Sequence, residues 1–309
     1  MDIRSELHKA KLFLNLELLA KQVVEGFISG IHKSPFHGFS SEFAEHKIYN
    51  TGESTKHIDW KLFARSDKLY TKRYEEETNL RCHMILDNSA SMYFPEVKNL
   101  ALDNLNKLGF GVLAIAALMN ILKKQRDAVG LSIFSEDYDF YVSEKSSERH
   151  FQMLLDKLNS VSLNTNPAKA TRTYHYLNQI AEKLSRRSLI FLFSDMFQTE
   201  VEEQKLFDAL RHLKHNKHEV VLFHLLDTEH ELNFNFDNSP KRFFDVETDQ
   251  HIDLYADTIK ENYKEQVTSY IEGLKLKCAQ YKIKYLKVDV RSNFSTVLNT
   301  LMTERQKFN

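Results

Sequence analysis

Five near-continuous apolar runs, separated by segments with helical spacing, limit how this chain can fold. They are CHMILD (82–87), AVGLSIFS (128–135), SLIFLFSD (188–195), EVVLFHLLD (219–227) and IKYLKVDV (283–290). Strands that are apolar on both faces are typical of a parallel sheet covered by helices on each side. The alternation of such strands with helices predicts an α/β fold built on a doubly wound, mostly parallel sheet of the Rossmann-like kind.

The segments between these runs carry apolar residues at the period of a helix. Helices are expected at about 107–125, 146–158, 174–186, 199–216 and 255–281, with a last one from an N-cap at Ser292 to about 306. The stretch 135–143 indicates a hairpin into a short edge strand.

Residues 1–80 do not follow this alternation. A helix at about 5–29 is followed by a segment that mixes aromatic and charged residues with short strand-like pieces. We therefore expect an N-terminal α+β extension over residues 1–80, packed on a sheet domain over residues 81–309.

Charge and apolar content exclude several classes of protein. The net charge is −1, with 42 basic and 43 acidic residues closely mixed, which gives no general attraction to nucleic acid or membrane. The longest apolar run, 111–122, is shorter than the ~18–20 residues that a membrane span needs. Cys82 and Cys278 lie far apart, which argues against a disulfide framework. We expect a cytoplasmic protein with no membrane span and no nucleic-acid partner.

Oxygen-bearing side chains follow two of the predicted strands. Asp87 ends the first apolar run and is followed by Ser89 and Ser91, and Asp195 ends the third run. Ligands of open parallel sheets bind beyond the carboxyl ends of the strands, so neighbouring strands would bring the two carboxylates into one crevice. An all-oxygen set suits a hard cation such as Mg²⁺, with Mn²⁺ or Ca²⁺ as alternatives. A serine that only caps the next helix is the other interpretation.

The spelling D-x-S-x-S at 87–91 resembles the signature of the von Willebrand factor A fold. In that fold a metal-ion-dependent adhesion site combines this loop with a threonine from a second loop and an aspartate after a later strand. The resemblance implies that Asp87, Ser89, Ser91 and Asp195 bind a metal.

Three threonines are candidates for the remaining ligand: Thr165, Thr171 and Thr173. Thr171 is preferred because it precedes the apolar positions of the following helix by the expected distance.

The stretch GESTKHIDWKLFARSDKLYTKRYEEET (52–78) resembles the hallmark of the domain-of-unknown-function 58 family, with Asp59, Trp60, Arg65 and Arg73 at matching positions. The resemblance implies a cytoplasmic bacterial protein, encoded beside a MoxR-type AAA+ ATPase, that acts as an assembly or adaptor component. We expect structural roles for the four residues: packing for Trp60, and an ion pair of Asp59 with Arg65 or Arg73. One departure from the family is an insertion at 93–107, expected to shape the rim of the site.

These observations favour a non-enzymatic, metal-dependent interaction module whose ion takes an acidic side chain from a protein partner, with a MoxR-type ATPase as the partner that the family implies. The alternative is a Mg²⁺-dependent phosphohydrolase that uses Asp87 as nucleophile. That chemistry needs an acid two residues later, where this chain has Ser89, and the sequence offers no Gly-rich phosphate loop.

Overall fold

The computed structural model describes residues 16–30, 43–49, 58–66, 68–74, 80–97, 104–135, 138–162, 173–185, 187–197, 200–237, 239–244 and 251–306. The chain divides into two compact units. One comprises Met1–Gly30 and Leu80–Phe308, and the other comprises Ile31–Asn79 with Asn309.

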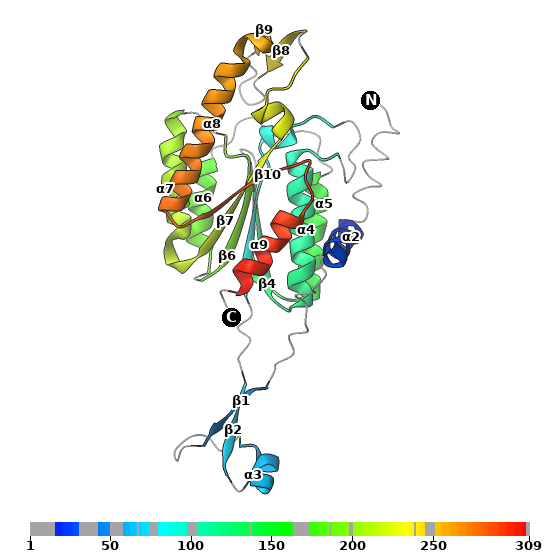
Figure 1. Ribbon diagram of the computed structural model, residues 1–309, viewed down its shortest axis with the longest axis vertical. Helices are drawn as coiled ribbons and strands as arrows, with labels where there is room; N and C mark the ends of the chain where they lie inside the picture. Colours follow the sequence, from blue (N-terminus) through cyan, green and yellow to red (C-terminus); the bar gives the residue numbers. More distant parts are fainter. Residues whose placement is uncertain are drawn as a thin grey trace. The chain divides into compact units, whose positions relative to one another are not determined.

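The first unit is built on a six-stranded sheet of order β10-β7-β6-β3-β4-β5 (Figure 1). Its strands are β3 (Arg81–Asp87), β4 (Ala128–Ser135), β5 (Tyr138–Lys145), β6 (Leu189–Ser194), β7 (Glu219–Leu226) and β10 (Lys284–Asp289). Neighbouring strands are parallel except β4 and β5, which pair antiparallel at one edge. The five apolar runs form the five parallel strands, and the predicted doubly wound α/β fold is confirmed.

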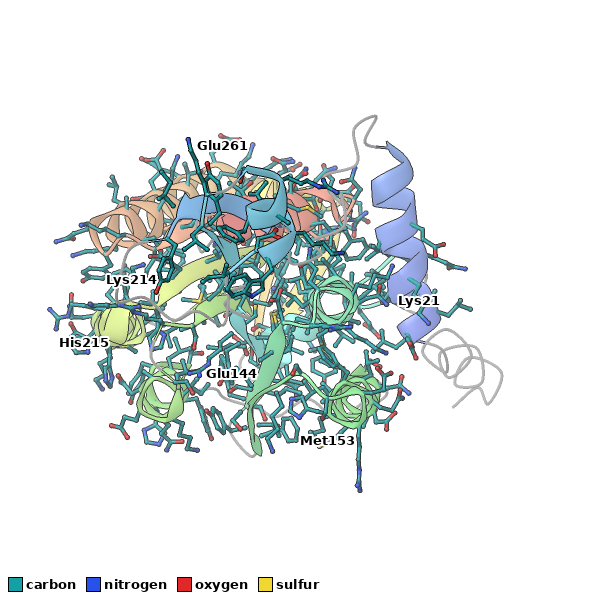
Figure 2. The ribbon with its side chains drawn as sticks, turned by 90° about the horizontal axis from the view of Figure 1, so that it is seen from below. Lys21, Glu144, Met153, Lys214, His215 and Glu261 are labelled. Atoms are coloured by element: carbon teal, nitrogen blue, oxygen red, sulfur yellow. The ribbon has the colours of Figure 1, made fainter. Side chains whose placement is uncertain are left out.

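Helices cover both faces of this sheet. They are α2 (Leu16–Gly30), α4 (Lys107–Lys124), α5 (Glu148–Ser162), α6 (Thr173–Lys183), α7 (Glu200–Lys214), α8 (Ala256–Gln280) and α9 (Ser295–Gln306). Helices α4, α5 and α9 lie on one face and α6, α7 and α8 on the other (Figure 1). Figure 2 shows the two layers from the end of the sheet, with Lys21 of α2 and Lys214 of α7 on opposite sides.

Shorter elements complete the unit. They are the 3₁₀ helices η2 (Ala90–Tyr93) and η3 (His215–Lys217), the π-helix η4 (Thr228–Leu232), and the antiparallel pair β8 (Pro240–Phe244) and β9 (His251–Tyr255) that leads into α8.

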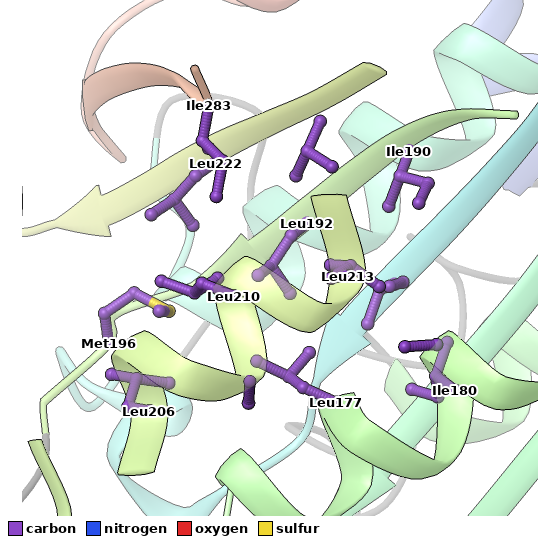
Figure 3. Packing of buried hydrophobic residues seen from close by; sticks show 14 of the residues in the cluster. Leu177, Ile180, Ile190, Leu192, Met196, Leu206, Leu210, Leu213, Leu222 and Ile283 are labelled. Atoms are coloured by element: carbon purple, nitrogen blue, oxygen red, sulfur yellow. The ribbon is translucent and has the colours of Figure 1, made fainter. Parts of the chain in front are cut away.

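The core consists of interdigitated aliphatic side chains on both faces. On one face, Leu177 and Leu210 of α6 and α7 pack against Leu192 and Leu222 of the sheet (Figure 3). On the other face, α4 is buried from Lys107 to Leu122, because α2 and α5 cover the side that the sheet does not. A helix enclosed in this way is apolar all round, as its sequence is.

Helix α2 belongs to the same compact unit as the six-stranded sheet and packs against α4 and α5. Leu16, Ala20 and Val24 form a stripe at four-residue spacing along α2, each no more than 4% exposed. The boundary near residue 80 between an extension and a sheet domain stays a prediction.

The second unit contains β1 (Phe43–Ile48), α3 (Trp60–Ser66) and β2 (Tyr70–Tyr74), with β1 and β2 antiparallel. The α+β character expected of the extension is therefore present in residues 31–79. Its packing on the sheet stays a prediction.

The family-motif residues begin α3. Asp59 is the N-cap: its Oδ1 accepts the backbone N–H of Lys61 at 3.0 Å and of Leu62 at 3.1 Å. Trp60 meets Phe63 edge to face, with ring centroids 6.2 Å apart, and its expected packing role stays a prediction. Arg65 lies in the last turn of α3, and Arg73 stands opposite Glu45 in the β1–β2 pair. The predicted ion pair of Asp59 with an arginine stays a prediction.

Gly130 of β4 offers a test of how tightly the sheet packs. A Cβ at this position would lie 2.4 Å from Nδ1 of His83 and 2.9 Å from the carbonyl oxygen of Val142. Gly130→Ala should therefore lower the free energy of unfolding by about 2–3 kcal/mol in urea denaturation, as overpacking does in buried sites.

Gly273→Ala on α8 is the matched control, because no described residue apart from its chain neighbours and the nearby backbone of α8 has an atom within 4 Å of the added Cβ. This change should raise stability by about 0.5–1 kcal/mol through helix propensity. Equal stabilities of the two variants would contradict the described packing around His83.

Candidate metal site

The strand order reverses between β3 and β6, which places a topological switch point at this pair. In doubly wound sheets the ligand crevice lies at the carboxyl ends of the strands beside such a point. Asp87 is the last residue of β3, and Asp195 directly follows the last residue of β6. Because Leu86 pairs with Phe193, the two strands end side by side, as the sequence analysis required.

Asp87 is held by hydrogen bonds to both carboxylate oxygens. Oδ1 accepts the backbone N–H of Ser89 at 2.9 Å, and Oδ2 accepts the hydroxyl of Ser194 at 2.6 Å. Burial, together with a smaller contribution from the negative charge of Asp195, raises the pKa of Asp87 to about 6, although the hydrogen bonds from Ser194 and Ser89 act to lower it. The two carboxylates therefore repel each other in a site that excludes water.

The loop after Asp87 brings two hydroxyls together. Oγ of Ser89 and Oγ of Ser91 lie 3.0 Å apart. Two adjacent ligands of an octahedral Mg²⁺ ion, each bound at ~2.1 Å, also lie ~3.0 Å apart. Within the described residues no group of three or more His, Cys, Asp or Glu side chains could hold a metal, so a cation here would need these hydroxyls. The donors that are present fit a hard divalent cation.

A buried lysine, which the sequence analysis did not predict, contacts this site. Nζ of Lys107, the first residue of α4, donates to Oδ2 of Asp195 at 2.8 Å and to Oε1 of Glu231 at 2.5 Å. The rings of Phe94 and Phe197 lie 5.8 and 5.6 Å from the same nitrogen. Burial acts to lower the pKa of Lys107, but attraction to the two carboxylates outweighs it and the net pKa is raised. The side chain is therefore an ammonium ion.

Glu231 belongs to η4, the π-helix that follows β7. Its second oxygen accepts the backbone N–H of Asp227 at 2.7 Å, and Asp227 caps η4 through the N–H groups of Glu229 and His230. Burial raises the pKa of Glu231, although Lys107 acts in the opposite direction. The carboxylates of Asp195, after β6, and Glu231, after β7, thus share one lysine at the edge of the sheet where Asp87 ends β3.

The structure describes four of the five predicted ligands. Asp87, Ser89, Ser91 and Asp195 stand at the ends of two adjacent strands, whereas Thr165 and Thr171 fall outside the described residues. Thr173, the third candidate, begins α6 and is 1% exposed. The two described ends of the 93–107 insertion meet where the N–H of Lys107 donates to the carbonyl oxygen of Phe94 at 3.0 Å.

The sequence did contain a signal for Lys107. It is the one charged residue at the start of a long apolar helix, and a helix N-terminus disfavours a cation. A lysine in that place needs carboxylates from elsewhere in the chain.

Two hydrolytic interpretations do not fit the geometry. The oxygens of Asp87 both accept hydrogen bonds, and the residue two positions later is Ser89, which is no general acid, so the phosphohydrolase chemistry lacks its parts. Ser132, His83 and Glu144 form a hydrogen-bonded series at 2.7 and 2.7 Å that resembles a hydrolase triad. Their side chains are at most 2% exposed, which closes the nucleophile to any substrate.

A comparison with family models decides the family. The model described as "Protein of unknown function DUF58" matches residues 45–271. The chain belongs to this family. The resemblance drawn from residues 52–78 is confirmed, and the sheet is the doubly wound, mostly parallel one that we expected.

Curated relatives match only a part of the chain. Uncharacterized proteins of Mycobacterium tuberculosis and Mycobacterium bovis are 30% identical over 79 residues, which is 26% of this chain and 25% of each relative. The chain thus spans about a quarter of the length of the curated relatives that it matches.

Solved structures are similar at low identity. An aerotolerance-related membrane protein from Bacteroides fragilis is 17% identical with a TM-score of 0.45, and the match covers 74% of this chain and 99% of that one. The SpRpn10 VWA domain is 12% identical with a TM-score of 0.37, over 72% and 94% of the two chains. An uncharacterized membrane spanning protein from Vibrio fischeri is 13% identical with a TM-score of 0.20, over 74% and 98%.

Two of these structures are described as membrane proteins. Their descriptions contradict the cytoplasmic location predicted from the sequence, and that prediction is withdrawn. Among the described residues, no helix combines the length and the apolar character that crossing a bilayer requires.

The raised pKa of Asp87 predicts a pH dependence of stability. An unfolded aspartate titrates near ~3.9, so the folded protein holds this proton more tightly than the unfolded chain does. The resulting stabilisation is complete below about pH 4 and is lost as the pH rises to about 6, a change of roughly 3 kcal/mol.

Asp87→Asn should remove this loss of stability at rising pH. In metal-free buffer the variant should gain stability relative to the natural chain as the pH rises through this window, and the difference should then stay constant. Urea denaturation at a series of pH values measures it. Parallel profiles for the two proteins would show that Asp87 is not destabilised by its surroundings.

Proposed function

We propose that this chain is a non-enzymatic, metal-dependent protein-interaction module. The ion is Mg²⁺, or Mn²⁺ or Ca²⁺ in its place, held by Asp87, Ser89, Ser91 and Asp195 together with Thr171. A doubly wound α/β domain of the DUF58 family is consistent with an interaction module.

One observation carries the proposal. Two carboxylates end adjacent strands at the switch point, and two hydroxyls lie 3.0 Å apart beside the first of them. A buried carboxylate such as Asp87, whose pKa is raised by burial and by the neighbouring charge of Asp195, favours any cation that neutralises it. A divalent ion would remove this repulsion and use the hydroxyls as neutral ligands.

The proposed ligands do not complete the coordination of the ion. Mg²⁺ takes six oxygens, and the proposed residues offer five at most, so a further position would accept an oxygen from outside the chain. A glutamate or aspartate of another protein is the ligand that such an ion prefers. The partner that we propose is a MoxR-type AAA+ ATPase, for which the chain would be an adaptor in the assembly or maturation of a client.

Mg²⁺ should bind with one site per chain in titration calorimetry, and Asp87→Ala should abolish this binding because it removes a buried carboxylate ligand. Binding of the MoxR-type ATPase should be lost in EDTA and in the same variant.

Thr171→Ala should weaken Mg²⁺ binding more than Thr165→Ala does.

Asp208→Ala is the matched control, since this aspartate lies exposed on α7. It should bind Mg²⁺ and the ATPase as the natural chain does. Equal Mg²⁺ binding by Asp87→Ala would exclude the metal site, and ATPase binding that resists both EDTA and Asp87→Ala would exclude the interaction mechanism.

A further inference from the structure

We infer that Lys107 is a specificity-determining residue, which sets the charge of the metal site at two negative units and thereby selects a divalent cation. The inference rests on the proposed metal site and goes beyond it, because it assigns a role to a residue that is not a ligand.

The charges around the site can be counted residue by residue. Asp87 and Asp195 are each 2% exposed, and the side chain of Glu231 is 13% exposed. Lys107, at 1% exposure, supplies one positive charge to this group. Three carboxylates and one ammonium leave two negative charges where water cannot screen them. A divalent cation balances these charges, whereas a monovalent or trivalent one does not.

The geometry lets the ammonium and a metal ion use the same carboxylate. Lys107 occupies Oδ2 of Asp195 at 2.8 Å. Oδ1 of Asp195 accepts the backbone N–H of Phe197 at 3.4 Å, which is a weak hydrogen bond. That oxygen is therefore available to a cation while the lysine stays in place. Lys107 also engages Glu231, which adds the third negative charge to the count.

A simple structural ion pair would predict something different. In that case the loss of Lys107 would affect stability and the position of Asp195, but not the charge of the preferred cation. A structural role and a role in selecting the cation can be separated, because variants can change the net charge of the metal site in steps and then restore it.

A series of full-length variants gives this charge ladder. Glu231→Gln leaves one net negative charge, the natural chain has two, Lys107→Met has three, and the double variant Lys107→Met/Glu231→Gln returns to two. Affinities for Mg²⁺ and for Tb³⁺ are measured for each in mildly alkaline buffer, by calorimetry and by Tb³⁺ luminescence. The difference in size between the two ions is the same in every variant, so it cancels when their affinity ratios are compared.

The ratio of Tb³⁺ to Mg²⁺ affinity should rise about tenfold or more in Lys107→Met and fall about tenfold in Glu231→Gln, because unit charges a few ångströms apart interact strongly in a partly buried site. The double variant should return to within about threefold of the natural chain. Lys123→Met, at the other end of α4, should leave the ratio unchanged.

Equal ratios in all variants would overturn the inference, and so would a double variant that departs from the natural chain as far as Lys107→Met does. If Lys107→Met does not fold, Glu231→Gln and the double variant still test the inference, because the affinity ratio should fall in the first and stay near that of the natural chain in the second. A natural chain that binds no Mg²⁺ would instead overturn the proposed metal site itself, a result distinct from an unchanged ratio.

Discussion

The buried ammonium of Lys107 must keep two carboxylates within hydrogen-bond distance, and the carboxyl edge of the sheet is arranged around this requirement. Removal of an ammonium from water costs several kcal/mol, and loss of one partner of a buried pair typically costs ~3–5 kcal/mol. Lys107 lies on α4, Asp195 follows β6, and Glu231 lies in η4 after β7. One ion cluster therefore fixes a helix start and two loops relative to each other, and the two rings beside the lysine exclude water from it.

The same arrangement leaves the edge with unbalanced charge. Asp87 receives hydrogen bonds from Ser194 and Ser89 but no cation among the described residues, and its pKa is raised. The negative charge of Asp87 is therefore unfavourable at the switch point of the sheet, and a bound cation would neutralise it. Buried ionisable groups with a shifted pKa lower the stability of a fold and are typical of catalytic and binding sites. This physical reason links the fold to the proposed interaction with an acidic partner.

The fold could be predicted because local patterns and the final structure agree. Runs such as 188–195 are apolar on both faces, and only a sheet covered on each side satisfies them. Asp87 and Asp195 were predicted to converge because both end strands, and the register of β3 with β6 places them together. Lys107 and Glu231 are separated by 124 residues, and no local period relates them.

Diffraction from crystals of the full chain grown with Mn²⁺, recorded for anomalous scattering, tests this account most directly. The account predicts one strong peak within bonding distance of the hydroxyls of Ser89 and Ser91, beside Asp87 and Asp195, with the Lys107 ammonium still on Asp195. A well-ordered edge with no peak at these residues, or a metal ion that displaces Lys107 from Asp195, would contradict it.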